Sequence, residues 1–417
     1  MSVAWAAYRM VAPVLGAAAP AARMFASPSE RPLWSERMGR VRDDLPADAW
    51  IHAASLGEAL AVGPLTRELL RLAPRARFHL TATTRGGRAR LGELGHPYSL
   101  APIDAPQAVA RFLAGVEPRR LILVETELWP HWLLAARARA IPVVVVSARL
   151  SSRSVERYAR LGSAFRRLVA GLAAVLCQGD EDEQRWLTLG APAARTTVTG
   201  NLKTDALAGP PADRRRARAD LGLDPDRLLI VLGNVRPGEV EPIARAWKAL
   251  DETVRRRWQV VAVPRHARAR ADLQAEAAQA GQSIVTGGRP GDGAWGWDER
   301  LGILGRYYSA ADVAVVGGTI AAYGGHNPLE PAACGVAVII GPHHWAQAEG
   351  VRALVATGGA RVAVDATALA DILRATLSDD DARATMARAA LETVRVQSGA
   401  AKRAVGRLAT WGVWPVA

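Results

Sequence analysis

The chain has 417 residues, half of them hydrophobic, and a formal net charge of +13, which provides for a sizeable core and favours two domains over one. A basic excess suits nucleic acid, anionic lipid or a phosphorylated substrate. No basic run is interleaved with aromatic residues, however, and no zinc-finger or RNA-binding signature occurs, which argues against a nucleic-acid partner. Cys177 and Cys334 lie far apart and in no metal-ligand spacing, which fits a reducing compartment or indifference to redox conditions.

The positive charge is concentrated in the first half of the chain. Residues 1–200 hold 26 basic and 17 acidic residues, a balance of +9, and the remainder holds 27 and 23, a balance of +4. Arginine is the usual cation, because only Lys203, Lys248 and Lys402 are lysines. A lysine in such a sequence suggests a need for a compact point charge, although chance explains each one singly.

The first 25 residues, MSVAWAAYRMVAPVLGAAAPAARMF, are mostly apolar. Arg9 interrupts them and Pro13 and Pro20 would kink a helix, so they lack the roughly 20 clean apolar residues of a spanning helix. GAAAPAA resembles a signal-peptide cleavage region, but no basic segment precedes the apolar part. We expect an uncleaved segment in the membrane interface, in preference to a weak signal anchor or a buried helix.

Short apolar runs then alternate with segments of helical spacing over residues 26–205. WIHAA, RFHLTATT, RLILVET, IPVVVVSA and AAVLCQG are typical of buried strands, and intervening segments such as AVGPLTRELLRLA are typical of helices. Repeated strand–helix units indicate a parallel sheet with helices on both faces. We therefore predict a first Rossmann-like domain here.

The alternation stops at ALAGPPADRRRARADLGL, where Gly-Pro-Pro and clustered charges predict a linker at residues 206–217. It resumes with RLLIVLGN, WQVVAVPRH, QSIVTG, ADVAVVGG and VAVIIGPH. These runs predict a second α/β domain over residues 218–417, with its last helices packing back on the first. Ligands of such sheets bind beyond the carboxyl ends of the strands, so two facing rims would form a cleft.

Ser55 and Glu58, in AASLGEAL, stand three residues apart where the first strand gives way to a helix. Ser-x-x-Glu is the capping-box spacing, in which each side chain satisfies a free amide at the helix start. A carboxylate at a strand end can also serve as a general base. The local pattern favours the cap, and the two roles are compatible.

A second polar cluster, GGHNPLEP, contains a helix start. Asn327 at the cap, Pro328 at the first helical position and Glu330 at the third are typical of one. A glycine-rich turn before a helix presents amides to an anion, and Glu330 could accept hydrogen bonds from a ribose diol. A capped helix without a ligand explains the pattern equally well. This motif has neither the G-x-G-x-x-G spacing nor a phosphate-binding Gly-Lys-Ser/Thr.

Two further strand ends carry charge. Arg265, in VAVPRH, could contact a phosphate, although a surface charge at a strand end is the simpler interpretation. Glu125 and Glu127, in ETELWP, are two apart, so both carboxylates can point to the same side.

Taken together and in order, these motifs resemble one family. HAASLGE, TATTRGG, APIDAPQAVARFL, LVETELWP, SARLSSRS, GNLKTD, VPRH and GGHNPLEPAA are similar to the motifs of 3-deoxy-D-manno-octulosonic acid (Kdo) transferases of lipopolysaccharide synthesis, across nearly the whole chain. The resemblance implies a GT-B type glycosyltransferase of two facing Rossmann-like domains. It implies CMP-Kdo as donor and a lipid A precursor as acceptor, at the cytoplasmic face of the inner membrane. It also implies inversion at the anomeric carbon, with no metal and no cofactor.

The resemblance also implies roles for residues that match the family motifs. Glu58 would be the base that deprotonates the acceptor, and Glu127 and Lys203 would stabilise charge in the transition state. The residues expected to touch the donor are Pro264, Arg265, Leu301, Gly302, Ile303, Asn327, Pro328, Leu329 and Glu330. Further substrate contacts are expected at Ser55, Gly57, Thr84 and Arg149.

The chain departs from the family pattern near the donor site. In GNVRPGEVE, Arg236 stands where the family has His, and Pro237 and Val240 stand where it has Glu. Gly302-Ile303 replaces the usual Gly-Glu pair. Two other interpretations stay open: another two-domain nucleotide-sugar transferase or epimerase, and a basic membrane-binding protein without catalysis. The oligomeric state and the number of Kdo units added do not follow from these motifs.

Overall fold

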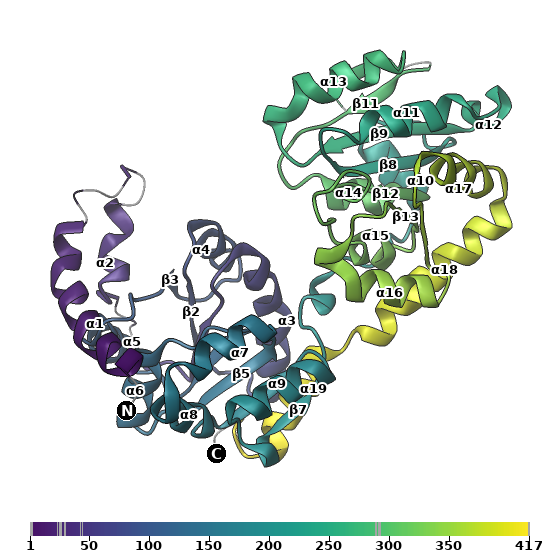
Figure 1. Ribbon diagram of the computed structural model, residues 1–417. Coiled ribbons are helices and arrows are strands. Elements are labelled where there is room, and N and C mark those ends of the chain that lie inside the picture. The colour runs from purple at the N-terminus through teal and green to yellow at the C-terminus, as the bar shows by residue number, and fades with distance from the viewer. Residues whose placement is uncertain are drawn as a thin grey trace. The chain divides into compact units, whose positions relative to one another are not determined.

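The computed structural model describes residues 3–415 apart from 23, 25, 26, 29, 30, 42, 44, 288, 289, 291 and 292. The chain forms two compact units. Unit 1 comprises the residues up to Ala206 together with those from Gln397 onward, and unit 2 comprises Leu207–Val396. In each unit, helices cover both faces of one parallel sheet (Figure 1).

The sheet of unit 1 has seven parallel strands in the order β3-β2-β1-β4-β5-β6-β7. The strands are β1 (Ala49–His52), β2 (Phe78–Ala82), β3 (Tyr98–Leu100), β4 (Leu121–Val124), β5 (Val143–Ala148), β6 (Ala174–Cys177) and β7 (Thr196–Val198). The longer helices are α1 (Val3–Ala22), α3 (Leu56–Leu72), α4 (Arg85–Gly92), α5 (Pro106–Val116), α6 (Pro130–Ala138), α7 (Ser152–Ala159), α8 (Gly162–Ala170), α9 (Asp180–Leu189) and α19 (Ala400–Thr410). Short helical turns are η2 (Arg31–Leu33), α2 (Trp34–Arg37), η3 (Ala193–Arg195) and η4 (Thr204–Ala206).

The sheet of unit 2 also has seven parallel strands, in the order β10-β11-β9-β8-β12-β13-β14. They are β8 (Leu228–Val235), β9 (Trp258–Pro264), β10 (Ile284–Thr286), β11 (Trp295–Trp297), β12 (Val313–Val316), β13 (Ala337–Ile340) and β14 (Ala360–Val362). The helices are α10 (Arg214–Asp220), α11 (Val240–Lys248), α12 (Glu252–Arg256), α13 (Arg270–Gln279), α14 (Leu304–Ala310), α15 (Leu329–Ala333), α16 (Ala348–Ala356), α17 (Ala366–Ser378) and α18 (Asp380–Gln397), with turns η5 (Ala267–Ala269) and η6 (Trp345–Gln347). Six strands follow the same order in both units, with β8 of unit 2 in the position of β1.

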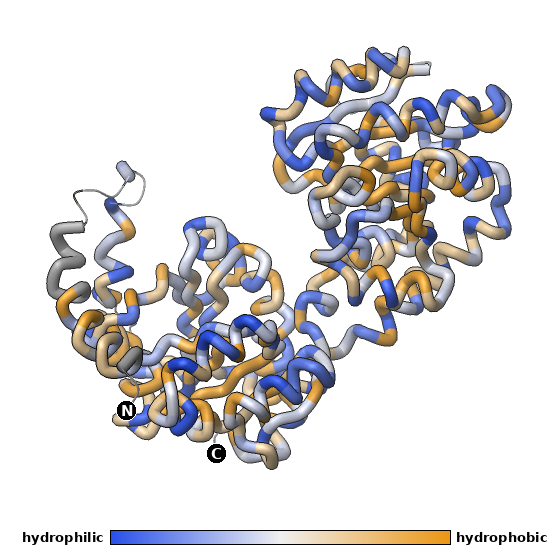
Figure 2. The backbone as a smooth tube through the Cα atoms, viewed as in Figure 1, coloured by the Kyte–Doolittle hydropathy of each residue, from blue (hydrophilic) through white to orange (hydrophobic). Residues whose placement is uncertain are grey.

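Both faces of the unit 1 sheet are buried, which is why its strands are continuous apolar runs. Trp50 packs on Phe112 and Trp132 on one face, and the opposite face packs against α3 and α19. The hydropathy view shows the apolar strands inside each unit (Figure 2). Trp414 donates from its indole to the Leu69 carbonyl at 3.1 Å, so the end of the chain is part of the unit 1 core.

The predicted fold class, two α/β domains with parallel sheets, is confirmed, and each of the ten predicted strands is present. The short strands β3, β7, β11 and β14 were not predicted. Each has three residues, too few for an apolar run to be distinguished from a loop.

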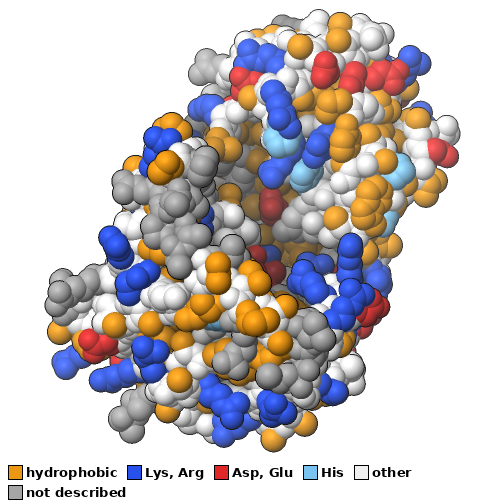
Figure 3. Space-filling model, turned by 60° about the vertical axis from the view of Figure 1, so that its left-hand side comes forward, with side chains coloured by type: hydrophobic (Ala, Val, Ile, Leu, Met, Phe, Trp, Pro, Cys, Tyr) orange, Lys and Arg blue, Asp and Glu red, His pale blue; other side chains and the backbone are white. Residues whose placement is uncertain are grey.

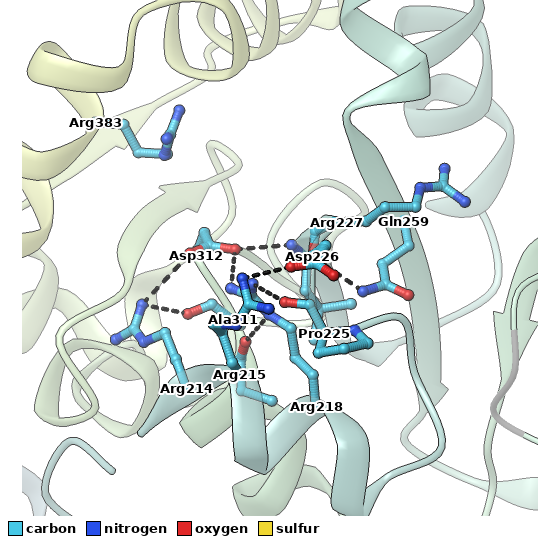
Figure 4. Close-up of polar contacts among 12 residues, drawn as sticks. Arg214, Arg215, Arg218, Pro225, Asp226, Arg227, Gln259, Ala311, Asp312 and Arg383 are labelled. Carbon is cyan, nitrogen blue, oxygen red and sulfur yellow. Dashed lines mark hydrogen bonds and ion pairs between the residues drawn. The ribbon is translucent and has the colours of Figure 1, made fainter. Parts of the chain in front are cut away.

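The segment expected as a linker ends in the first turn of a helix, because α10 begins at Arg214. Arg214 and Arg215 of this segment, and Arg218 just beyond it, are bound within unit 2 (Figure 4). The Arg218 guanidinium lies 2.5 Å from the Asp312 carboxylate, and Arg214 donates to the Ala311 carbonyl at 2.6 Å. Residues 207–213 carry no helix or strand, and the charges that follow them attach α10 to the residues just before β12.

Helix α1 packs on α5 and α8 along one side. Trp5 is buried against Phe165, and the Tyr8 hydroxyl donates to the Asp104 carboxylate. Met10 and Val14 remain 69% and 66% exposed. Among the described residues, no helix has the length and hydropathy needed to cross a membrane. Residues 1, 2, 23 and 25 of the predicted interface segment lie outside the described part.

Candidate active site

Glu58 lies in the first turn of α3, directly beyond the carboxyl end of β1. Ser55 is the N-cap and its hydroxyl accepts from the Glu58 amide at 3.3 Å. The Glu58 carboxylate accepts from the Ala54 amide at 2.8 Å and from the Ser55 hydroxyl at 2.9 Å. The predicted cap therefore forms, with Ala54 supplying the amide that reaches the carboxylate.

The environment of Glu58 makes it more basic than an ordinary glutamate. Burial raises the pKa of its carboxyl, and the nearby Glu125 and Glu127 carboxylates raise it further, against the lowering effect of the Ala54 amide and the Ser55 hydroxyl. Three carboxylates thus lie near one another where β1 and β4 end side by side. A carboxylate with a raised pKa accepts a proton more readily, which is the property a general base needs.

Lys203 pairs with Glu125. Its ammonium forms an ion pair with the Glu125 carboxylate, and the two side chains are 35% and 14% exposed. Glu125 has a left-handed backbone, with φ at 65°, which costs a non-glycine residue energy and is found where a site requires it. The strained turn after β4 thus places a carboxylate against the lysine that follows β7.

The turn that carries Lys203 is fixed by side chains from two other strand ends. The Lys203 amide donates to the Asn201 side-chain oxygen at 2.9 Å, and the Leu202 amide donates to the Ser147 hydroxyl at 3.2 Å. Gln178 in turn donates to the Ser147 carbonyl at 3.0 Å. The motif GNLK therefore has a rigid backbone that aims one lysine at the carboxylates.

Glu127 occupies the same strand end in a different setting. Its carboxylate accepts from the Trp129 indole at 2.8 Å and lies 3.7 Å from Nε2 of His52. Burial would raise the pKa of Glu127, but the proximity of His52, the Trp129 hydrogen bond and the charge of Arg157 outweigh it and hold the pKa below its usual value. Glu127 is thus held ionised, in contrast to Glu58.

The remaining residues predicted for unit 1 surround this edge. Thr84 caps α4 by accepting from the Gly87 amide at 3.2 Å, and its own amide donates to the Ala54 carbonyl. Gly57 and Arg149 are exposed. A side chain at Gly87 would meet Ala82 and Ser55 at 2.9 and 3.1 Å, so the loops after β1 and β2 pack closely.

In unit 2, cationic and imidazole side chains gather beyond β8, β9 and β12. Arg236, Arg265 and His266 all act on His326, whose pKa falls to about 4 through burial and through their charges. Lys or Arg and His side chains lie next to one another on the surface of this unit (Figure 3). The Arg236 guanidinium stacks over the Tyr323 ring at 4.1 Å. The two arginines supply the positive charge here, because His326 is neutral near pH 7.

The helix predicted to start at Pro328 begins one residue later, at Leu329. Asn327 still serves the start, since its side-chain oxygen accepts from the Leu329 amide at 3.0 Å. Burial raises the pKa of Glu330, and the Arg265 charge and the Asn327 hydrogen bond lower it in part. Pro264 is the buried last residue of β9, so Arg265 and the segment 327–330 lie at one edge of the sheet.

The stretch Leu301–Ile303 is partly exposed and partly buried. Leu301 and Gly302 are exposed, and Gly302 has φ at 79°. Ile303 is buried in the same core cluster as Val263. An apolar residue, Ile303, therefore occupies the position where the family motif has a glutamate.

Two residues of these edges were missed by sequence reasoning. Glu239 is fully buried and its carboxylate accepts from the amides of Arg236, Gly318 and Ile320 at 2.8–2.9 Å, and from a fourth at 3.2 Å. His52 is fully buried beside Glu127. The signals available were the Arg-x-x-Glu spacing and a histidine inside a wholly apolar strand. No three His, Cys, Asp or Glu side chains of the described residues are placed to share a metal ion.

Known proteins share both the sequence and the fold. The family model for 3-deoxy-D-manno-octulosonic-acid transferase matches residues 33–206. The 3-deoxy-D-manno-octulosonic acid transferase of Bordetella pertussis is 38% identical over 389 residues, which cover 89% of each chain. The chain belongs to the Kdo transferase family. The transferase of Haemophilus influenzae is 31% identical over 90% of this chain and 91% of its own.

Membership of the Kdo transferase family makes the chain a glycosyltransferase of lipopolysaccharide synthesis, as predicted. Its fold extends beyond that family. The solved structure of UDP-GlcNAc 2-epimerase from Neisseria meningitidis bound to UDP-GlcNAc has a TM-score of 0.61 over 87% of this chain and 99% of its own, at 14% identity. A similarity at that identity concerns the fold alone.

Proposed function

We propose that this Kdo transferase moves Kdo from CMP-Kdo to a hydroxyl of a lipid A precursor. The observation that carries the proposal is Glu58, a carboxylate with a raised pKa that lies beside Glu125, Glu127 and Lys203 at one strand edge. It occurs in a chain 38% identical to a Kdo transferase over most of its length. A metal-independent, inverting displacement fits such a site.

In this mechanism Glu58 removes the proton of the acceptor hydroxyl as its oxygen attacks the anomeric carbon of Kdo. The bond from that carbon to the CMP phosphate breaks, and CMP leaves with the electron pair. The Lys203 ammonium stabilises negative charge that is present on the donor and develops on the leaving group. Glu127, held ionised, stabilises positive charge that develops on the sugar ring.

Unit 2 holds the donor in this proposal. Arg265 and Arg236 supply positive charge for the phosphate and for the carboxylate of Kdo. Glu330 accepts hydrogen bonds from the ribose. Arg236, which stands where the family has a histidine, keeps its charge at any physiological pH, so the cationic character of this edge does not depend on histidine protonation.

Helix α1 and the basic charge of the first half of the chain support a membrane location. Met10, Val11 and Val14 are exposed apolar side chains on one helix, and residues 1–200 carry a balance of +9. We place the enzyme on the cytoplasmic face of the inner membrane, with the exposed side of α1 in the interface and basic residues on anionic lipid.

A product assay tests the function directly. The protein is incubated with a lipid A precursor and CMP-Kdo generated in situ, and the lipid products are weighed by mass spectrometry. We expect a mass increase of one or more Kdo residues and the release of CMP. In competition, CMP should inhibit and UDP should not. Inhibition by UDP alone, with no change in lipid mass, would identify the enzyme with UDP-sugar chemistry instead.

A further inference from the structure

One buried line of polar side chains has no part in the mechanism above. Trp50 and His52 are two residues apart on β1 and so point to the same face of the sheet. Thr81 lies on β2 directly opposite His52 in the parallel register. All three side chains are fully buried. Buried polar groups are costly unless they are hydrogen-bonded, so their partners decide what the line does.

The hydrogen bonds in this line have a direction. The Trp50 indole N–H can only donate, and it donates to the Thr81 hydroxyl at 2.7 Å. A hydroxyl accepts up to two hydrogen bonds but donates only one, and no other acceptor for the Thr81 hydroxyl is found among the described residues, so we assign its proton to Nδ1 of His52, 2.9 Å away. Since Nδ1 accepts, the neutral imidazole carries its proton on Nε2.

Nε2 of His52 faces Glu127. It lies 3.7 Å from the carboxylate and has no hydrogen-bond partner among the residues that the structure describes. The ring edge meets Trp132, with ring centroids 4.8 Å apart, so the imidazole is held in place by packing. The gap is longer than a hydrogen bond, and contacts of this kind often tighten only when substrate is bound.

We propose that His52 is a positioning residue for Glu127: the relay from Trp50 through Thr81 fixes the Nε2–H tautomer, and that N–H orients the ionised carboxylate toward the sugar. The inference rests on the proposed function, because it gives Glu127 a role in the reaction. The lowered pKa of Glu127 is consistent with it.

Other groups also face Glu127, and they determine how a pH profile is interpreted. The Trp129 indole and the Arg157 charge favour the ionised carboxylate, and Glu58 and Tyr158 lie nearby. Loss of His52 leaves burial less opposed, so the pKa of Glu127 rises. The acidic limb of the rate profile should then move to higher pH.

The experiment compares His52→Leu, His52→Gln and a matched control, His79→Leu. His79 is also buried, on the neighbouring strand β2, and bonds to Asp43 and Ser99 instead. We expect His52→Leu to lower kcat about 10- to 100-fold, the effect of losing a hydrogen bond to a charged group. The KM for CMP-Kdo should change by less than about twofold, because the donor is not touched.

His52→Gln should keep kcat within about threefold of the wild type, because the amide can accept from Thr81 and donate to Glu127. His79→Leu should lower the melting temperature as much as His52→Leu does and leave kcat and the acidic limb unchanged. In a Glu127→Gln background, His52→Leu should have less than about a twofold further effect, as expected for residues that act as a unit.

The inference is overturned if Glu127→Gln is inactive while His52→Leu matches the His79→Leu control in kcat, or if His52→Gln is as impaired as His52→Leu. Either result would leave the proposed function standing. Absence of Kdo transfer by the wild-type enzyme would overturn the proposed function itself.

Discussion

Glu58 and Glu239 both lie where the central strand of a unit is followed by a helix, and they behave differently. Glu58 is in the first turn of α3, after β1, and Glu239 is the N-cap of α11, after β8. Glu239 is fully buried and accepts from four backbone amides. Glu58 is half-buried and accepts from one amide and one hydroxyl.

The difference lies in what surrounds each carboxylate. Burial raises the pKa of both carboxyl groups. Around Glu239, the hydrogen bonds from backbone amides oppose that effect, and the carboxylate links these amides to one another. Around Glu58 the neighbours include two further carboxylates, which raise its pKa again. Glu239 therefore joins the loop after β8 to the loop after β12. The ionised form of Glu58 is destabilised by its surroundings, which increases its tendency to take up a proton.

Glu58→Gln should produce the largest effect. The amide keeps the shape of the side chain and one acceptor oxygen for the cap but loses the base, so turnover should fall about 100- to 10,000-fold. A raised pKa means that folding favours the protonated form, and that stability is lost as pH rises through the folded-state pKa. Glu58→Gln should therefore melt at or above the wild-type temperature at pH 8, with a smaller difference at acidic pH.

A change in turnover of less than about threefold, with the fold intact, would refute the base assignment and leave Glu58 as a cap only. Circular dichroism at each pH provides the control for folding.

Glu239→Ala should be mainly destabilising. Removing the carboxylate leaves buried amides without an acceptor, and we expect a loss on the order of 3 kcal/mol in the free energy of unfolding. Glu58→Ala should cost only about 1 kcal/mol, the usual effect of losing a helix cap. Denaturant titration of both variants measures the difference, and equal losses would contradict the comparison.

The edge of unit 2 that carries Arg236 and Arg265 should control donor affinity. Arg265→Ala and Glu330→Ala should weaken CMP binding about 10- to 100-fold, as expected for a lost hydrogen bond to a charged group at roughly 1.5–3 kcal/mol. Arg268→Ala, an exposed neighbour, is the matched control and should bind CMP normally. In calorimetry at pH 6 and 8, His326 stays neutral because its pKa is about 4, and a change of affinity over this range should follow the second ionisation of the CMP phosphate, at about pH 6. Unchanged affinity in both variants would exclude this edge as the CMP site.

The smallest effect concerns unit 1 alone. Deleting residues 1–25 should reduce flotation with anionic liposomes, and high salt should reduce it further, since each engaged basic residue contributes about 1 kcal/mol at low salt. Because the deletion also removes the buried Trp5 from the unit 1 core, Met10→Asp with Val14→Asp is the matched variant, which should lose flotation but keep its fold and its activity on a detergent-dispersed acceptor. Flotation equal to that of the full chain at every salt concentration would show that α1 is a structural helix instead.

Local patterns were sufficient for much of the fold. Runs of β-branched residues such as VVVV in β5 favour buried strands, and Ser55-x-x-Glu58 marked a true helix start. Motif order indicated the family. Three of the strands that were not predicted, β3, β7 and β14, lie at sheet edges, and a short edge strand is defined by its neighbour's hydrogen bonds and not by its own composition. The last four residues of the predicted linker belong to α10, because Arg214 there binds Asp312 and the Ala311 carbonyl, which are distant in the sequence.

Tertiary structure alone decided which polar residues act together. Spacing places Glu125 and Glu127 on one side of a turn, but only the folded chain pairs Glu125 with Lys203 and Glu127 with His52. It also gives Glu58 and Glu239 different surroundings, although their local sequence contexts are similar. The physical reason is that a strand end is a local feature, whereas burial, the number of amide donors and the distance to other charges depend on loops that come from distant parts of the chain.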